Sequence, residues 1–196
     1  MDFKDLSELI IKQKIIKQKR PALFFDRDGV LIEDCNYISN PNDVVLEKCS
    51  KSLVRLAYNL GWIIVIVSNQ SGISREFLTW NDYDLVTNKM ISLFGEPNPF
   101  YGIYANAESP KSLNKKWRKP KPNMIFRASE VLNIDLEKSI IVGDRKSDLL
   151  SGLKAGIKLL IHTKTGHGIN EILEIKHLKE EYKILNDLEF ININNL

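Results

Sequence analysis

The chain has 196 residues, of which 43% are hydrophobic and 27% are charged, and its net charge at pH 7 is +3. A chain of this length buries roughly 70% of its unfolded surface, so it needs no disulfide or structural metal to fold. Its two cysteines, Cys35 and Cys49, exclude a disulfide framework and a four-cysteine zinc site. The sequence has no long apolar run and no signal-peptide pattern, so we expect a soluble cytoplasmic domain that does not span a membrane.

Residues 1–20 hold the excess of positive charge. They carry six basic and three acidic side chains, whereas the other 176 residues carry 22 of each sign. Leu6, Leu9 and Ile16 could share one face of a helix. We therefore predict a basic N-terminal helix or tail over residues 1–20, separate from a domain formed by residues 21–196. An arm that binds a membrane surface or nucleic acid is the alternative.

Short apolar runs alternate with helical patterns from residue 21 onward. We predict strands over residues 22–25, 62–67, 100–104, 139–142, 157–161 and 182–185. We predict helices over residues 51–60, 81–94, 122–132, 146–155 and 169–175. Such alternation predicts an α/β fold with a parallel, Rossmann-like sheet that is covered by helices on both faces. Ligands bind such sheets beyond the carboxyl ends of the strands.

Acidic residues follow two of these predicted strands. Asp26 and Asp28 come directly after the first strand, and Asp144 and Asp148 come after the fourth. Neighbouring carboxylates repel each other unless a positive charge lies between them. Hard oxygen ligands suit Mg²⁺, so the two acidic pairs together predict a magnesium site. Taken singly, each aspartate could instead cap a helix.

Groups that suit phosphate lie nearby in the predicted topology. Residues 68–71 (SNQS) follow the second strand and offer hydroxyl, amide and backbone N–H groups. Residues 111–121 (KSLNKKWRKPK) contain six basic residues and no acid, and they include Arg118 and Lys119. Each stretch alone could be a polar turn or a solvated loop. Together with the acidic pairs, they predict phosphoryl transfer at the strand ends.

These residues suggest a covalent mechanism. Asp26 would attack phosphorus and form an aspartyl-phosphate, and Asp28 would protonate the leaving oxygen and then activate water. Ser68 and Lys119 would hold the phosphoryl oxygens, while Mg²⁺ would offset the repulsion between phosphate and carboxylate.

Four stretches resemble the motifs of the haloacid dehalogenase superfamily of phosphatases. They are FFDRDGVL, IVSNQ, the lysine of RKP, and GDRKSD. DRDG, SNQSGI, RKPKPNM and a late TGHG resemble the small subfamily that contains D-glycero-D-manno-heptose 1,7-bisphosphate phosphatase and histidinol phosphatase. The resemblance covers about residues 21–190. Only about 40 to 50 residues separate successive motifs, so we expect no large cap domain and a site gated by loops 35–42 and 106–116.

The resemblance assigns a role to each motif residue. Asp26 becomes the nucleophile, and Asp28 becomes the acid and base. Mg²⁺ ligands would be Asp26, the backbone carbonyl of Asp28, and Asp144, with Ser68 and Lys119 steadying the phosphoryl group. The residues expected to contact the substrate are Arg27, Asp34, Cys35, Asn36, Tyr37, Asn69, Gln70, Ser71, Arg118 and Arg145. Arg145 stands where the family usually has a lysine.

One departure concerns a zinc loop that family members often carry, with a Cys-x-His pair and a Cys-x-Cys pair. The corresponding residues 104–108 (YANAE) and 115–118 (KKWR) contain none of these ligands, so we predict no zinc. Since that loop borders the substrate pocket in the family, the sugar and its anomer stay open. The lysines could instead attract a second phosphate.

The leading expectation is a monomeric, Mg²⁺-dependent phosphomonoesterase that removes the 7-phosphate of a heptose bisphosphate, without membrane or nucleic-acid partners. A histidinol phosphatase or another sugar phosphatase, a polynucleotide phosphatase, and a non-catalytic phosphate-binding protein are the alternatives. We expect Cys35 to be a bystander near the site, and His162, His167 and His177 to be surface or turn residues.

Overall fold

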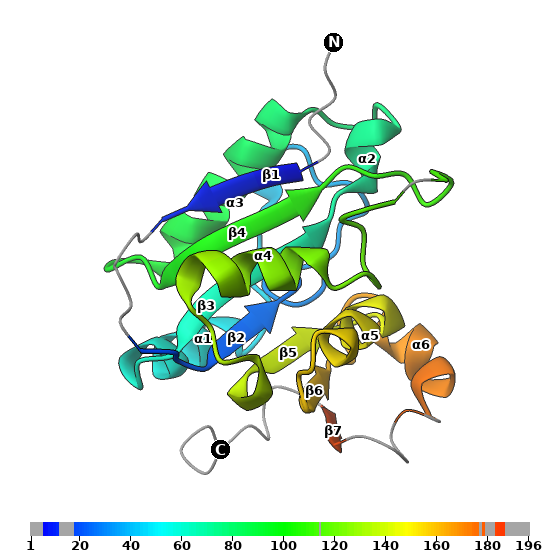
Figure 1. Cartoon of the computed structure of the whole chain (residues 1–196). Helices are drawn as coiled ribbons and strands as arrows, with labels where there is room; N and C mark the ends of the chain where they lie inside the picture. Colours follow the sequence, from blue (N-terminus) through cyan, green and yellow to red (C-terminus); the bar gives the residue numbers. More distant parts are fainter. Residues whose placement is uncertain (1–5, 12–17, 114, 177, 179–182, 187–196) are drawn as a thin grey trace.

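The central element of the computed structural model is a seven-stranded sheet, and residues 6–11, 18–113, 115–176, 178 and 183–186 are described (Figure 1). The strand order is β1-β4-β3-β2-β5-β6-β7. The strands are β1 Leu6–Ile10, β2 Ala22–Phe25, β3 Ile63–Asn69, β4 Phe100–Asn106, β5 Ile140–Gly143, β6 Leu159–His162 and β7 Lys183–Asn186. All neighbouring pairs are parallel except β1 and β4, which are antiparallel.

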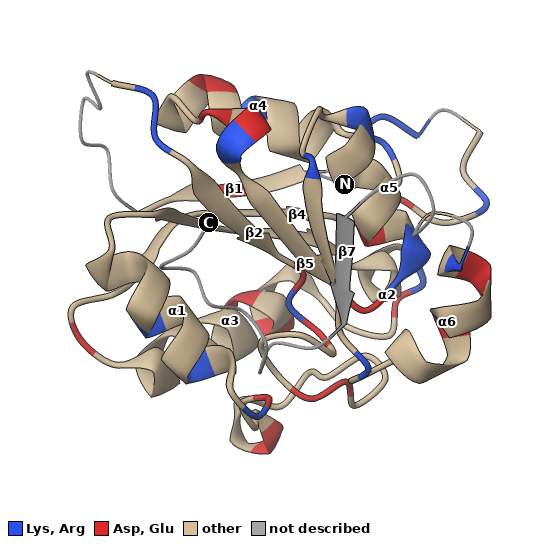
Figure 2. Ribbon diagram, turned by 90° about the horizontal axis from the view of Figure 1, so that it is seen from below, with Lys and Arg blue, Asp and Glu red and all other residues tan. Residues whose placement is uncertain are grey.

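Helices cover both faces of this sheet, as the sequence predicted (Figure 2). The helices are α1 Ser50–Asn59, α2 Ser71–Ser74, α3 Trp80–Phe94, α4 Asn123–Leu132, α5 Lys146–Lys154 and α6 Gly168–Ile175, with short 3₁₀ turns at Pro41–Asp43 and Leu136–Lys138. α1 and α3 pack on one face, and α4 and α5 pack on the other. None of the helices in the described ranges has the length and apolar character needed to cross a bilayer.

The apolar runs of the sequence become the central strands because the helices bury both of their faces. In β2, Leu23 and Phe25 point into the core under α1 and α3, whereas Phe24 points into the core under α4 and α5. All three side chains are fully buried, and each contributes about 2–3 kcal/mol through the hydrophobic effect. α3 begins at a capping box in which the Thr79 hydroxyl and the Asp82 carboxylate each accept the other residue's backbone N–H.

The helix predicted for the N-terminal segment is wrong over Leu6–Ile10, which form the edge strand β1. This strand pairs with β4 from Leu6 opposite Asn106 to Ile10 opposite Gly102. The pairing satisfies backbone groups of β4 that would otherwise form an open sheet edge. Residues 6–10 are therefore part of the same sheet as the rest of the chain, while Ile16 lies outside the described residues.

The chain reverses its direction of travel across the sheet at β2. The next strands in sequence, β3 and β4, lie on one side of β2, and the later strands β5 and β6 lie on the other. A crevice forms beyond the carboxyl ends of the strands at such a switch point. The residues that follow β2, β3 and β5 therefore meet at one edge of the sheet.

Candidate active site

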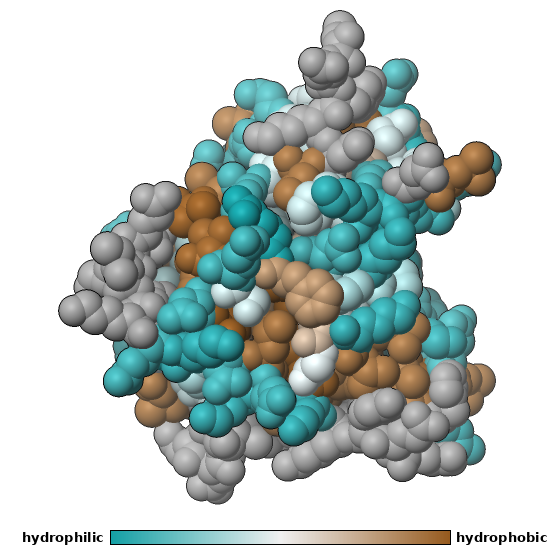
Figure 3. All heavy atoms as spheres, in the orientation of Figure 1, coloured by the Kyte–Doolittle hydropathy of each residue, from teal (hydrophilic) through white to brown (hydrophobic). Residues whose placement is uncertain are grey.

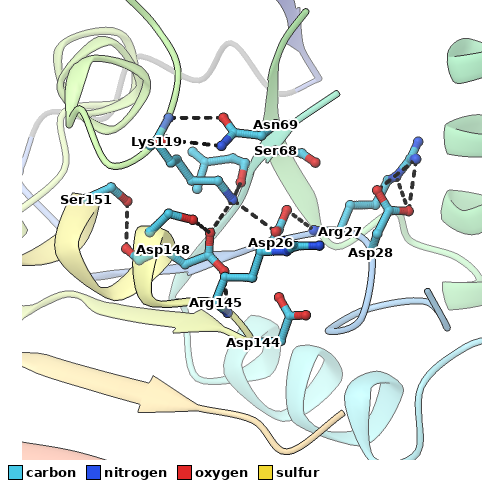
Figure 4. Close-up of polar contacts among 12 residues, drawn as sticks. Asp26, Arg27, Asp28, Ser68, Asn69, Lys119, Asp144, Arg145, Asp148 and Ser151 are labelled. Atoms are coloured by element: carbon cyan, nitrogen blue, oxygen red, sulfur yellow. Dashed lines mark hydrogen bonds and ion pairs between the residues drawn. The ribbon is translucent and has the colours of Figure 1, made fainter. Parts of the chain in front are cut away.

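Asp26 lies at the carboxyl end of β2, at the switch point of the sheet. Only 8% of its surface is exposed. One carboxylate oxygen accepts the Arg27 backbone N–H at 2.7 Å, and the other lies 3.1 Å from the ammonium nitrogen of Lys119 (Figure 4). Two fixed donors hold this carboxylate in one orientation.

Lys119 is buried and reaches Asp26 from the loop before α4. Its Nζ donates to the Val67 carbonyl at 2.8 Å and forms ion pairs with Asp148 at 2.8 Å and Asp26 at 3.1 Å. Burial opposes the positive charge, but the Asp148 and Asp26 carboxylates outweigh it and raise the pKa of Lys119. The lysine is therefore a fixed cation at the floor of the site.

Three buried carboxylates meet here. Asp26, Asp144 and Asp148 each offer an oxygen within 4.8 Å of the others, and Figure 4 shows the Asp144 carboxylate facing Asp26. Burial, with Asp148 and Asp26 nearby, raises the pKa of Asp144 to about 8. Burial also raises the pKa of Asp26 to about 6, although Lys119 opposes this shift.

A divalent cation fits this cluster. The Asp144 Oδ1 atom is buried and has no hydrogen-bond partner among the residues that the structure describes. Its other oxygen accepts the His167 backbone N–H at 2.8 Å. A buried, unpaired carboxylate oxygen that faces a second carboxylate matches the hard oxygen ligands of Mg²⁺.

Two glycines allow the backbone to approach Asp144. Gly29 and Gly166 have φ values of +77° and +52°, in the region that favours glycine. A Cβ atom on Gly29 would lie 2.8 Å from Asp144 Oδ2, and one on Gly166 would lie 2.5 Å from the same oxygen. The backbone at Gly29 of the DG stretch and at Gly166 of the TGHG stretch therefore packs directly against the Asp144 carboxylate.

Arg27 and Gln70 orient the Asp28 carboxylate. The Arg27 guanidinium bonds to Asp28 at 3.0 Å and lies 4.7 Å from the centre of the Tyr83 ring. Gln70 Nε2 donates to Asp28 at 2.7 Å and to the Ser68 hydroxyl at 2.8 Å. The Arg27 guanidinium is buried against these protein groups and holds Asp28 in place, and the predicted contact between Arg27 and the substrate stays a prediction.

A cavity of about 560 Å³ opens at this edge of the sheet. Figure 3 shows a hollow lined mainly by hydrophilic residues. The predicted site residues that line the cavity are Asp26, Arg27, Asp28, Asp34, Asn36, Tyr37, Asn69, Gln70, Ser71, Arg118, Lys119 and Arg145. Among the described residues, three predicted ones do not line it. Ser68 and Asp144 are buried behind the wall, and Cys35 is exposed outside it.

Known proteins with related sequences include phosphatases that are named for heptose 1,7-bisphosphate. A curated relative from Helicobacter pylori (strain ATCC 700392 / 26695), a D-glycero-beta-D-manno-heptose-1,7-bisphosphate 7-phosphatase, is 37% identical over 80% of this chain and 94% of its own length. An alpha-anomer 7-phosphatase from Photorhabdus laumondii is 35% identical over 80% of this chain and 89% of its own. The chain belongs to the haloacid dehalogenase-like phosphatase family. The HAD-hydrolase-like family model matches residues 116–189.

Solved structures of haloacid dehalogenase-like proteins share the fold. A HAD-like phosphatase from Mesorhizobium loti superposes with a TM-score of 0.77, at 29% identity, over 84% of this chain and 82% of its own. The D,D-heptose 1,7-bisphosphate phosphatase from B. bronchiseptica, complexed with magnesium and phosphate, also gives 0.77, at 24% identity, over 86% of this chain and 93% of its own.

The structure of this haloacid dehalogenase-like phosphatase adds Arg75 and His167 to the predicted site residues, and it shows a partner of Asp148 that the sequence did not predict. Asp148 pairs with Lys119, Arg75 lines the cavity, and the His167 ring lies 3.1 Å from Asp34. The sequence predicted Asp148 as the second acid of the pair in GDRKSD, and TGHG was the available signal for His167. His162 is fully buried at the end of β6, so the surface position expected for it is wrong, and His177 lies outside the described residues.

The carboxylate cluster predicts that stability depends on pH and metal. The pKa of Asp26 rises from 3.8 to about 6, and that of Asp144 rises to about 8. The folded state therefore binds protons more tightly than the unfolded state, so the free energy of unfolding falls as pH rises from about 4 to about 8. The Asp26 shift alone corresponds to about 3 kcal/mol. We expect chelator-treated phosphatase to unfold at lower urea concentration at about pH 8 than at about pH 5.

Magnesium should restore most of this loss at the higher pH and little at the lower pH, since the ion binds the ionised carboxylates. Asp144→Asn should weaken the dependence of the free energy of unfolding on pH, because the variant lacks the carboxyl group whose pKa is raised to about 8. A free energy of unfolding that rises between these two pH values in the chelator would contradict the assignment of these carboxylates.

Proposed function

We propose that the chain is a Mg²⁺-dependent phosphomonoesterase that removes the 7-phosphate of D-glycero-D-manno-heptose 1,7-bisphosphate through an aspartyl-phosphate. The observation that carries the chemistry is the buried Asp26 carboxylate, held beside Lys119 at the floor of a cavity that Asp28 also lines. Relatives named for the beta and alpha anomers support the substrate class and leave the anomer open.

In the first step, an Asp26 carboxylate oxygen attacks phosphorus, and the bond between phosphorus and the sugar oxygen breaks. Asp28 donates its proton to that oxygen, so the sugar leaves as an alcohol. Arg27 and Gln70 hold Asp28 for this transfer. Lys119 lies 3.1 Å from the attacking carboxylate, where its ammonium can bind a phosphoryl oxygen as charge shifts.

In the second step, water attacks the phosphorus of the aspartyl-phosphate. Asp28 removes a proton from that water, the bond between Asp26 and phosphorus breaks, and inorganic phosphate leaves. Asp26 and Asp144 of the acidic cluster would hold magnesium, together with the Asp28 backbone carbonyl that the family resemblance implies, and the bound ion would neutralise the charge of the phosphoryl group.

Cations at the rim of the cavity support a substrate with a second phosphate. Arg75, Arg118, Arg145 and Lys146 line its wall. Burial, with Arg145 and Arg75 nearby, lowers the pKa of Arg118. An anion among these side chains would relieve their repulsion, and arginine suits phosphate because its donors form a planar fork. A cavity of about 560 Å³ falls in the size range of small-molecule sites.

A phosphate-release panel with Mg²⁺ tests this proposal. It includes both heptose 1,7-bisphosphate anomers, heptose 7-phosphate, histidinol phosphate and a 3′-phosphorylated oligonucleotide. We expect the bisphosphates to have kcat/KM values about 10- to 100-fold above heptose 7-phosphate, because a charge-assisted contact contributes about 1.5–3 kcal/mol. Cleavage of only histidinol phosphate or only the oligonucleotide would reject the heptose substrate.

A further inference from the structure

Glu108 binds the backbone of the loop that carries Arg118. Its side chain follows β4, only 7% of the residue is exposed, and its two oxygens accept three successive backbone N–H groups. The donors are Lys116 at 2.6 Å, Trp117 at 2.9 Å and Arg118 at 2.7 Å. Hydrogen bonds to a buried carboxylate are strong, so this contact fixes the path of the loop.

Asn69 binds the backbone of the next residue of the loop, Lys119. Its side-chain oxygen accepts the Lys119 backbone N–H at 3.0 Å, and its amide donates to the Lys119 carbonyl at 3.2 Å. Asn106 donates to the Asn69 oxygen at 2.6 Å and accepts the Glu108 backbone N–H at 3.2 Å. Side chains from the ends of β3 and β4 thus bind four successive N–H groups, from residue 116 to residue 119.

The side chains of Lys119 and Arg118 lie in different parts of the cavity. Lys119 reaches down to Asp26 and is held independently by Asp148 and the Val67 carbonyl. Arg118 is half-buried at the cavity wall, and its guanidinium donates to the Glu108 carbonyl at 3.1 Å. Arg118 therefore donates twice to Glu108: its backbone N–H bonds to the Glu108 carboxylate, and its guanidinium bonds to the Glu108 backbone carbonyl. Loss of the Glu108 carboxylate should displace Arg118 more than Lys119.

We infer that Glu108 is a positioning residue, which sets the Arg118 guanidinium to bind an anionic group of the substrate other than the phosphate that is cleaved. This inference rests on the proposed bisphosphate substrate. The described residues that line the cavity include Arg118 and not Glu108, so Glu108 affects the substrate through Arg118.

Glu108→Gln tests the inference, because glutamine keeps the shape but loses the charge and replaces one acceptor oxygen with an NH₂ group. We expect KM for the heptose bisphosphate to rise about tenfold, with kcat within about threefold of wild type and KM for heptose 7-phosphate unchanged. In an Arg118→Ala background, Glu108→Gln should have no further effect on KM. Glu137→Gln, at an exposed ion pair with Lys158, is the matched control.

Amide hydrogen exchange across residues 116–119 provides a readout besides activity, and it should be faster in Glu108→Gln than in Glu137→Gln. Equal losses with both sugar phosphates, or a full further effect in the Arg118→Ala background, would overturn the positioning role. A wild type that prefers the bisphosphate, with a Glu108→Gln variant that keeps this preference, would reject the inference alone. A wild type with no such preference would reject the proposed substrate as well.

Discussion

Asp26→Asn is expected to lower kcat for phosphate release by about 10⁴- to 10⁶-fold, because a neutral amide cannot form the aspartyl-phosphate. The variant should fold at least as well as the metal-free wild type. Its Oδ1 atom can still accept the Arg27 N–H, and the substitution removes one of three mutually repelling carboxylates. The measurement is steady-state phosphate release with Mg²⁺, alongside urea unfolding in a chelator.

Mass spectrometry of acid-quenched enzyme should find one phosphoryl group on the wild-type peptide that contains residue 26, and none on this peptide in the variant. Asp84→Asn, at an exposed position of α3, is the control for the same chemical change and should retain wild-type turnover. Turnover by Asp26→Asn at the wild-type rate, or a phosphoryl group on another residue, would exclude Asp26 as the nucleophile. Phosphate binding without turnover by the wild type would instead favour the non-catalytic alternative.

The sheet could be predicted from the sequence because its central strands are short, uninterrupted apolar runs. The predicted runs 22–25 and 62–67 correspond to β2 Ala22–Phe25 and to residues 63–67 of β3, which are buried on both faces, the environment that such runs indicate. The first strand could not be predicted in this way. LSELI fits a helical face as well as a strand, and its conformation depends on pairing with β4, about 95 residues later in the chain.

The placement of Asp26 and Asp144 follows from topology, because neighbouring parallel strands end at the same edge of the sheet. The directions of side chains do not follow from it. Arg27 lies between two site aspartates in sequence, but its guanidinium turns toward Tyr83 and Thr87 in α3. Asp148 could be placed near the site, but its ion pair with Lys119 depends on how α5 packs against the loop before α4.

The contact between residues 104–108 and residues 115–118 is a further feature that could not be predicted from the sequence. The resemblance marks these two stretches as the places of zinc ligands, and their composition predicts no zinc. The structure joins the two stretches through the Glu108 carboxylate and three backbone N–H groups. Every residue except proline has a backbone N–H group, so residue types alone do not indicate which N–H groups bind a carboxylate. The sequence therefore did not predict the hydrogen bonds between Glu108 and residues 116–118. Whether zinc binds stays a prediction.

Lys119→Met is expected to remove activity and stability together. In the wild type, the ammonium lies 3.1 Å from Asp26 and 2.8 Å from Asp148, and both carboxylates are buried. Removing one partner of a buried ion pair costs about 3–5 kcal/mol, because the remaining charge lacks both water and a counter-ion. We expect the free energy of unfolding in a chelator to fall by this amount at about pH 8. The loss should be smaller at about pH 5, where a larger share of Asp26 is protonated.

The double variant Lys119→Met/Asp148→Asn separates the two roles of the lysine. It removes one of the two orphaned carboxylates, so it should recover most of the lost stability, as measured by urea unfolding. Its kcat should stay about 10²- to 10³-fold below wild type, because no ammonium remains to bind the phosphoryl oxygens. Lys158→Met, which breaks an exposed ion pair with Glu137, should change neither property. Recovery of activity together with stability would mean that Lys119 acts only as the counter-ion of the buried carboxylates, and that phosphoryl stabilisation must come from other residues of the cavity.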